Sequence, residues 1–489
     1  MHNTFYPARK LTGLLLVVLF LASQSVTAQF DSLNLTVGTQ ITGATKQFQP
    51  HYITSNRWGS VTDRKFDPAL FLSLSNKHVL HEFSPQNTDT GFIPRTLSFD
   101  YGAVVYGNNQ FNDVLLQQGY GRISFKKWAI TGGRFEELVG GMDPDLSTGS
   151  LGVSGNALPI PKIGIAVTDW VNVPFINGWL RFKGTFYHGW FGKGRYLNDA
   201  FYHEKTFYMQ LVFGRLKLYG GLQHFGEWGG RRGNLTLDRN FKGFWNVLLV
   251  REATDGGGLP STIRPGRAGD QRGLVEAGAD WENESIRLHL YNQTPFETGI
   301  GIDFRNIDRL AGISVERKAP TGLKRILGEF IYTKQSEGYG REVHSYYNNG
   351  NYKTGWDYKD RIIGTPLFTN RVRASKYFDT IVPYDWSAPD NTIKPNSNIV
   401  NNRVVGLNLG ALYNWNNSLQ TKTVITLTRN YGALETNEFS PSKDQAYLLQ
   451  EFRYNPETSK WNVVLALGYD FGDLSDNAGG LLKVGYRLF

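Results

Sequence analysis

The chain has 489 residues, including 31 Phe, 25 Tyr, 12 Trp and 55 Gly, and it contains no cysteine. The lack of cysteine excludes a disulfide-stabilised scaffold, a lipoprotein anchor and a cysteine nucleophile. The formal charge of +9 at pH 7 is a modest excess for this length and suits an anionic lipid or glycan surface as well as nucleic acid.

Residues 1–28 are predicted to be a secretory signal peptide. Arg9 and Lys10 precede an apolar run, Leu11 to Ala22, that is too short to span a bilayer as a helix. Val26-Thr27-Ala28 places small residues where signal peptidase needs them, so the mature chain is expected to begin at Gln29. Export makes nucleic acid an improbable partner and leaves the mature chain with a formal charge of +7.

The mature chain shows the two-residue periodicity of membrane-spanning strands. No apolar run after residue 28 is long enough for a transmembrane helix. Instead, apolar residues alternate with polar ones in short segments, as strands require when one face meets lipid and the other a lumen. Leu33 to Gly43 is the first such segment, followed by Leu97 to Val105 and by a hairpin in Gly121 to Phe135 with its turn at Lys126-Lys127.

Two further hairpins have the clearest alternation. Phe207, Met209, Leu211 and Phe213 share a face before a predicted turn at Gly214-Arg215, and Leu216, Leu218 and Leu222 share a face after it. In the next hairpin, Val275 to Trp281 and Ile286 to Leu290 flank a turn at Glu282-Asn283-Glu284. Such short turns are typical of the periplasmic rim of a barrel.

The C-terminus is an amphipathic strand that ends on an aromatic residue. Leu482, Val484, Tyr486 and Leu488 alternate with Lys483, Gly485 and Arg487 before Phe489. This ending resembles the terminal strand that the barrel assembly machinery of the outer membrane recognises, so that machinery and outer-membrane lipid are expected partners.

These segments predict an all-β, transmembrane antiparallel barrel in the bacterial outer membrane. Counting similar runs suggests about 16 to 18 strands of roughly ten residues. Residues 29–489 are expected to form the barrel, within which 29–95 could supply a periplasmic or plug element. Residues 335–402 alternate poorly and are rich in Tyr, Asn and Gly, so they are interpreted as a long extracellular loop region.

Several blocks of sequence, in order along the chain, resemble the Wzi family of capsule assembly proteins. They are Gln49-Pro50-His51-Tyr52, Asn56-Arg57-Trp58-Gly59, Ser154 to Pro161, Lys183-Gly184, His188 to Phe191, His203-Glu204-Lys205, Gly221 to His224, Trp228-Gly229-Gly230, Tyr346 to Gly350, Gly355-Trp356 and Ile363 to Pro366. The resemblance implies an eighteen-stranded lectin barrel whose lumen is closed by inward loops. It also implies that the protein holds capsular polysaccharide or exopolysaccharide at the cell surface without transforming it.

One feature departs from the family pattern. Its best-known members carry a helical bundle before the barrel, whereas Leu33 to Gly43 has the alternation of a strand. The N-terminal plug element is therefore expected to be small or absent.

No motif for catalysis, a metal or a cofactor is present, so none of these is predicted. The chain lacks a Gly-x-Ser-x-Gly elbow, a His-Glu-x-x-His motif and a P-loop. Asp143 and Asp145 flank a proline and are better explained by turn chemistry than by a cation site. His188, His203 and His224 are interpreted as lumen or rim residues and not as metal ligands.

Two clusters are candidates for polysaccharide binding, because sugars stack on aromatic rings while their hydroxyls and acidic groups bond to amides and cations. The first cluster lies in the long loop and the second near residue 230. The candidate residues are Tyr346, Tyr347, Asn349, Tyr352, Trp356 and Arg361, together with Trp228, Arg231 and Arg232. Aromatic girdles and loops without a sugar ligand are the alternative explanation.

Two other functions fit a barrel of this size. An open lumen would make it a porin or substrate-selective channel. An outer-membrane lipid or glycan hydrolase would need a serine and a histidine brought together by folding, which the sequence alone does not test.

Overall fold

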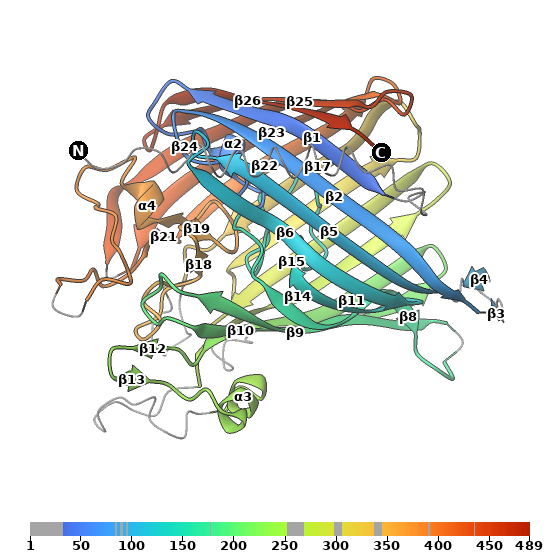
Figure 1. The fold of residues 1–489 in the computed structure, drawn as a ribbon, viewed down its shortest axis with the longest axis horizontal. Helices are drawn as coiled ribbons and strands as arrows, with labels where there is room; N and C mark the ends of the chain where they lie inside the picture. The colour runs from blue at the N-terminus through green and yellow to red at the C-terminus, as the bar shows by residue number, and fades with distance from the viewer. Residues whose placement is uncertain are drawn as a thin grey trace.

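Eighteen antiparallel strands form one closed barrel in the computed structural model of this protein (Figure 1). The structure describes residues 33–83, 86–88, 91–93, 96–176, 178–251, 268–297, 306–336, 345–389, 392–434 and 436–489. Each strand pairs with its neighbours in the chain, and the first strand closes the barrel on the last, with Val37 opposite Tyr486. The predicted signal peptide, residues 1–28, lies outside the described residues.

The barrel strands are β1 (Asn34–Ala44), β2 (Phe66–Glu82), β5 (Thr96–Asn108), β6 (Asp113–Phe125), β7 (Trp128–Arg134), β8 (Lys162–Asn172), β9 (Leu180–Gly192), β10 (Ala200–Phe213), β11 (Leu216–Trp228), β14 (Asp270–Glu282), β15 (Ile286–Phe296), β16 (Arg309–Arg317), β17 (Gly322–Tyr332), β22 (Val404–Asn414), β23 (Leu419–Ala433), β24 (Asn437–Tyr454), β25 (Trp461–Gly472) and β26 (Asn477–Arg487). The connections contain the short strands β3 (Gln86–Thr88), β4 (Gly91–Ile93), β12 (Arg231–Arg232), β13 (Leu235–Thr236), β18 (Asp357–Tyr358), β19 (Arg361–Ile362), β20 (Thr369–Asn370) and β21 (Ile399–Asn401). They also contain three helices, α2 (His51–Thr54), α3 (Phe241–Leu248) and α4 (Arg371–Ala374).

The outer surface of the barrel is apolar, as a bilayer requires. Leu407, Leu409, Leu427 and Leu467 are each about half exposed on outward positions of neighbouring strands. Aromatic residues such as Trp128, Trp415 and Trp461 flank this band at one end, and Phe66, Trp190 and Tyr469 flank it at the other. Closure satisfies every strand edge, and the band faces hydrocarbon, so the molecule is a transmembrane β-barrel. None of the helices in the described part of the chain has the length and apolar character of a membrane span.

The predicted strands and turns are confirmed. β10 and β11 join at Gly214-Arg215, and Phe207, Met209 and Phe213 face outward. β6 and β7 join at Lys126-Lys127, where Lys126 adopts a φ of 54° that the tight turn needs. Leu33 to Gly43 corresponds to β1, so the strand predicted there is confirmed.

The two ends of the barrel differ in the length of their connections. At the short-turn end most strands join through brief turns, such as the two residues between β10 and β11, and β1 begins and β26 ends there. At the long-loop end the connections include residues 45–65, 135–161 and 229–269, and the stretch between β17 and β22. The functional features described below lie at or inside the long-loop end.

Three of these connections fold into the barrel and close its lumen. We refer to residues 45–65, 135–161 and 345–402 as the first, second and third plug segments. Each contributes a side chain with no exposed surface, respectively Ile53, Leu146 and Trp356, to a single hydrophobic core. The prediction of a lumen occluded by loops is therefore confirmed, and α2 is a small plug element near the N-terminus.

Acidic side chains of the barrel wall hold the plug by its backbone. The Glu276 carboxylate on β14 accepts a hydrogen bond from the amide of Gly141 at 2.5 Å. Glu329 on β17 accepts one from the amide of Thr148 at 2.9 Å, and Asp470 on β25 accepts one from the amide of His51 at 2.8 Å. Because a buried amide without a partner is costly, these contacts fix where each plug segment crosses the lumen.

Of the two positions expected for three histidines, lumen or rim, the lumen is wrong. The lumen is not lined by His188, His203 or His224. Each lies an even number of residues from an outward-facing residue of its own strand, respectively Trp190, Phe207 and Leu222, and therefore points to the same outer face. They are nevertheless buried or half-buried, since α3 covers them from outside the barrel.

Candidate functional site

The aromatic residues predicted to bind polysaccharide in the long loop form the core of the third plug segment. Tyr346, Tyr347, Tyr352 and Trp356 are all buried, and Trp356 has no exposed surface. In this arrangement a sugar has no access to their ring faces, which pack against protein. The closed plug thus gives no support to their contact with polysaccharide, which stays a prediction.

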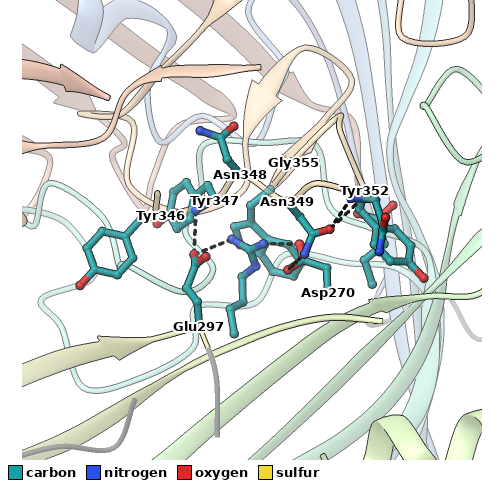
Figure 2. Close-up of polar contacts among 12 residues, drawn as sticks. Asp270, Glu297, Tyr346, Tyr347, Asn348, Asn349, Tyr352 and Gly355 are labelled. Carbon is teal, nitrogen blue, oxygen red and sulfur yellow. Dashed lines mark hydrogen bonds and ion pairs between the residues drawn. The ribbon is translucent and has the colours of Figure 1, made fainter. Parts of the chain in front are cut away.

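A buried arginine on the barrel wall anchors the start of this segment (Figure 2). Arg272 on β14 forms ion pairs with Asp270 and, at 2.9 Å, with Glu297. Glu297 also accepts a hydrogen bond from the amide of Tyr347 at 2.7 Å, and Asp270 accepts one from the side chain of Asn349 at 3.1 Å. The predicted residue Asn349 thus connects the plug to the wall.

Trp356 connects the third plug segment to the second. Its indole N–H donates to the carbonyl oxygen of Gly152 at 2.7 Å, and the guanidinium of Arg272 lies 4.7 Å from its ring centre. Phe191 and Phe225 of the barrel wall contact the same ring. This indole is therefore a central packing residue of the closed lumen.

Arg361 connects the third plug segment to the first. Its guanidinium donates to the carbonyl oxygens of Thr54, at 3.3 Å, and of Val61. The three inward connections thus form one hydrogen-bonded body, and Arg361 is positioned as a structural cross-link.

Asp357 is a titratable group within this body. Its backbone carbonyl accepts from Arg195, which is paired with Glu227 of β11 at 2.5 Å, and its carboxyl accepts from the side chain of Asn370 at 2.6 Å. Burial is the main reason that the pKa of this carboxyl is raised from 3.8 to about 7, and the nearby Asp360 adds to it.

We expect the plug to loosen as the pH rises. The closed plug binds the Asp357 proton more tightly than an opened plug would. This proton therefore stabilises the closed state fully below pH 3.8, and the stabilisation is lost as the pH rises to about 7. Over this window the opening constant should increase by up to about tenfold per pH unit. Hydrogen exchange of the amides of residues 345–389, corrected for its intrinsic pH dependence, measures this opening. Asp357→Asn should lower the slope by about one proton, and an unchanged slope would exclude Asp357 as its source.

The second cluster of predicted residues is accessible. Arg231 is exposed and Arg232 partly exposed on β12, beside a surface cavity of about 590 Å³. Lys193, Ser387 and Pro389 also line this cavity, so three connections meet there. We call Lys193, Tyr196, Arg231, Arg232, Lys353 and Lys394 the basic surface.

The ring of Tyr196 gathers three cations of the basic surface. The guanidinium of Arg232 lies 4.2 Å from the ring centre of Tyr196, and the ammonium groups of Lys353 and Lys394 lie 5.5 and 5.6 Å from it. Arg232 is held by the carbonyl oxygens of Tyr196 at 3.0 Å and Trp386 at 3.1 Å. Arg231 is paired with Asp199 at 2.6 Å but remains exposed. The combination of ring, cations and open cavity suits an acidic sugar polymer.

Trp228 does not belong to this surface. It is buried on the outer wall of the barrel, where it packs against Phe201 and Phe244. Its ring is covered by the connection that carries α3.

A second cavity occupies the lumen at the short-turn end. It has a volume of about 890 Å³ and is lined by residues that include Trp170, Arg181 and Gln210. A smaller cavity of about 230 Å³ shares Trp170 with it and ends against residues 140–144 of the second plug segment. The plug thus lies between this vestibule and the basic surface.

The acidic residues singled out in the sequence have structural roles. Asp143 accepts hydrogen bonds from the amides of Asp145 and Leu146, both at 3.0 Å, which is the expected turn chemistry. It also lies 3.1 Å from Arg325 of β17. Within the described ranges, no group of three or more His, Cys, Asp or Glu side chains is arranged to hold a metal.

Sequence reasoning missed Lys193, Tyr196 and Lys394. Each is an ordinary loop residue, and only folding brings residues near 195, 231, 353 and 394 to one place. The charge pattern Lys193-Gly194-Arg195-Tyr196, with glycine beside cations in a strand connection, was the one local signal.

Comparison with protein families gives one match. A family model described as capsule assembly protein Wzi matches residues 81–371, which is more than half of the chain. No curated protein matches the chain.

Comparison with solved structures gives several matches. One is described as Wzi, an outer membrane protein involved in group 1 capsule assembly in Escherichia coli and a carbohydrate-binding β-barrel. It is 12% identical with a TM-score of 0.56, over 99% of this chain and 89% of that one. Others are Pseudomonas aeruginosa OccK5, 8% identical with a TM-score of 0.44 over 94% and 97% of the two chains, and OpdL, 9% identical with a TM-score of 0.45 over 94% and 99%.

Proposed function

Because this chain belongs to the Wzi family of capsule assembly proteins, we propose that it binds exported capsular polysaccharide or exopolysaccharide and holds it at the surface of the cell. The protein is placed in the bacterial outer membrane. Short turns are typical of the periplasmic side of such barrels, so the long-loop end, including residues 335–402, faces outward in this proposal.

One observation carries the proposal: the basic surface lies at the mouth of a closed barrel. The half-buried ring of Tyr196 holds three cations together, and these cations provide charges for carboxylate or phosphate groups on a sugar. The adjacent cavity of about 590 Å³ is large enough to admit part of a sugar chain. Arg231 and Arg232 are the predicted residues that this geometry favours.

The polymer is held without being changed or transported. A continuous channel is disfavoured, because the three plug segments fill the lumen between the basic surface and the vestibule. A hydrolytic role has no specific observation in its favour, so the binding role is the proposal.

Two further partners belong to this proposal. Outer-membrane lipid surrounds the apolar band. The barrel assembly machinery recognises the C-terminal strand β26, which pairs with β1 and is followed by the exposed Phe489.

The proposal is tested by deleting the gene in its encapsulated host. We expect polymer synthesis to continue while the polymer moves from the cell surface into the medium, as measured by sugar analysis of cells and supernatant. Complementation with the unaltered chain should restore attachment. Loss of synthesis, or polymer that stays on the cells, would contradict a role in attachment.

A further inference from the structure

The helix α3 lies outside the barrel, on the membrane-facing wall formed by β9, β10 and β11 (Figure 1). Phe244 packs against His188, His203 and Trp228, with ring centres 6.0 to 6.1 Å apart. All three partners occupy outward positions of their strands, because they share the parity of Trp190, Phe207 and Leu222.

The helix is docked on this wall and not simply adjacent to it. A Cβ on Gly226 would lie 3.1 Å from the side chain of Val247, so the glycine leaves room for close packing. The ammonium group of Lys205 donates to the carbonyl oxygen of Leu248, which caps the C-terminal end of the helix. At the other end, the side chain of Asn240 accepts a hydrogen bond from the amide of Gly243 at 2.8 Å.

The opposite side of α3 carries an exposed apolar stripe. Phe241, Trp245 and Leu249 are spaced by four residues and therefore lie on one face, and they are exposed by 72%, 41% and 49% respectively. Lys242 and Arg251 are exposed beside the stripe. An amphipathic arrangement with aromatic residues on one side and cations next to them is typical of helices that lie in a membrane interface.

The stripe continues the lipid-facing surface of the barrel. Trp190, 43% exposed, belongs to the aromatic residues that flank the apolar band at the long-loop end. Its ring contacts His188, which in turn contacts Phe244 of α3. The exposed stripe is thus in line with a surface that already faces lipid.

The wall beneath α3 explains why a helix is needed there. His203 is fully buried beside His224, and His224 is bonded to Gln271 at 3.1 Å through one ring nitrogen. Imidazole nitrogens and the Lys205 ammonium facing acyl chains directly would be costly. The helix separates this polar cluster from hydrocarbon and presents apolar side chains in its place.

We propose that α3 is an interfacial membrane element whose apolar stripe inserts among the lipid acyl chains of the leaflet at the long-loop end. Lys242 and Arg251 then meet the phosphate groups of that leaflet. Because β12 and β13 directly precede α3 in the chain, the inserted helix sets the height of Arg231 and Arg232 above the bilayer. The inference goes beyond polysaccharide binding and holds or fails independently of it.

The absence of cysteine permits a direct test by site-directed spin labelling. Full-length protein is reconstituted into nanodiscs that hold one barrel each, in a phospholipid bilayer with lipopolysaccharide in one leaflet. Labels are placed by Trp245→Cys and, in a second variant, by Phe241→Cys. Leu409→Cys on the apolar band is the lipid-exposed control, and Thr380→Cys on the exposed part of the third plug segment is the water-exposed control.

We expect both labels on α3 to be relaxed by oxygen as strongly as the label at Leu409, and to be protected from a water-soluble nickel complex. Accessibility to nickel equal to that at Thr380 would overturn the proposal. Spin–spin broadening that appears only when two barrels share a disc would assign the stripe to a second copy of the chain, and would overturn it as well. Since the readout does not involve polysaccharide, failure here leaves the proposed binding function untouched.

Discussion

The protein reconstituted in a planar bilayer should show no stable ion-conducting openings, whereas a variant that lacks two of its plug segments should conduct in large, long-lived steps. In this variant residues 136–160 and 345–389 are each replaced by a short Gly-Ser linker. The expectation follows from the single core that joins Leu146 and Trp356 inside the barrel and fills the lumen among the described residues. An eighteen-stranded wall without this core encloses water.

The single deletions separate the contributions of the two segments. Removal of 345–389 alone leaves Gly141 and Thr148 bonded to Glu276 and Glu329, so the second plug segment still crosses the lumen. We therefore expect small or brief openings from either single variant. A linker in place of residues 231–236, which lie beside the mouth, is the control and should remain silent (Figure 1). Large openings of the intact protein would favour a channel, and a silent double variant would show that these segments do not close the lumen.

Charge reversal on the basic surface should abolish most of the binding of an acidic polymer. In the variant Lys193→Glu/Arg231→Glu, both changes fall on exposed residues that line the cavity of about 590 Å³. Loss of a hydrogen bond to a charged group costs about 1.5–3 kcal/mol, and 1.4 kcal/mol corresponds to a factor of ten. Together the two changes should weaken binding by about a hundredfold or more, because the new carboxylates also repel the polymer.

The measurement is a binding titration of purified host polymer against the protein in nanodiscs, at low and high salt. Lys376→Glu is the matched control, since it makes the same change on an exposed residue of the third plug segment near α4. It should bind as the unaltered protein does, and high salt should weaken the unaltered protein more than the charge-reversed one. Equal losses in both variants would argue against a specific site, and full binding by the charge-reversed variant would rule out the basic surface.

Parts of the fold were predictable because the faces of each strand follow from the alternation of neighbouring residues. The outward side chains of Phe207 and Phe213 and the turn at Gly214-Arg215 follow from a two-residue period and a tight-turn signal, and both are confirmed. The same two-residue period places His203 on the outward face of its strand, together with Phe207. The sequence analysis left lumen and rim open for this histidine, because α3 was not visible as its cover.

The plug could not be predicted in this way. Trp356 and Tyr347 lie in a stretch without periodicity. Nothing in the local sequence distinguishes an aromatic residue that binds a sugar from one that packs inside the plug. Their burial depends on Arg272, Gly152 and Phe225, which lie between 75 and 204 residues away in the chain. The basic surface has the same origin, since its cations come from separate connections.

The sequence by itself determined that the chain forms a closed membrane barrel, because hydrocarbon imposes alternation and closure on each strand independently of the others. Only the tertiary structure decided that the lumen is filled, that α3 covers the outer wall, and which cations surround Tyr196. These features arise from contacts between connections that are distant in the chain, and such contacts produce no periodic pattern in the sequence.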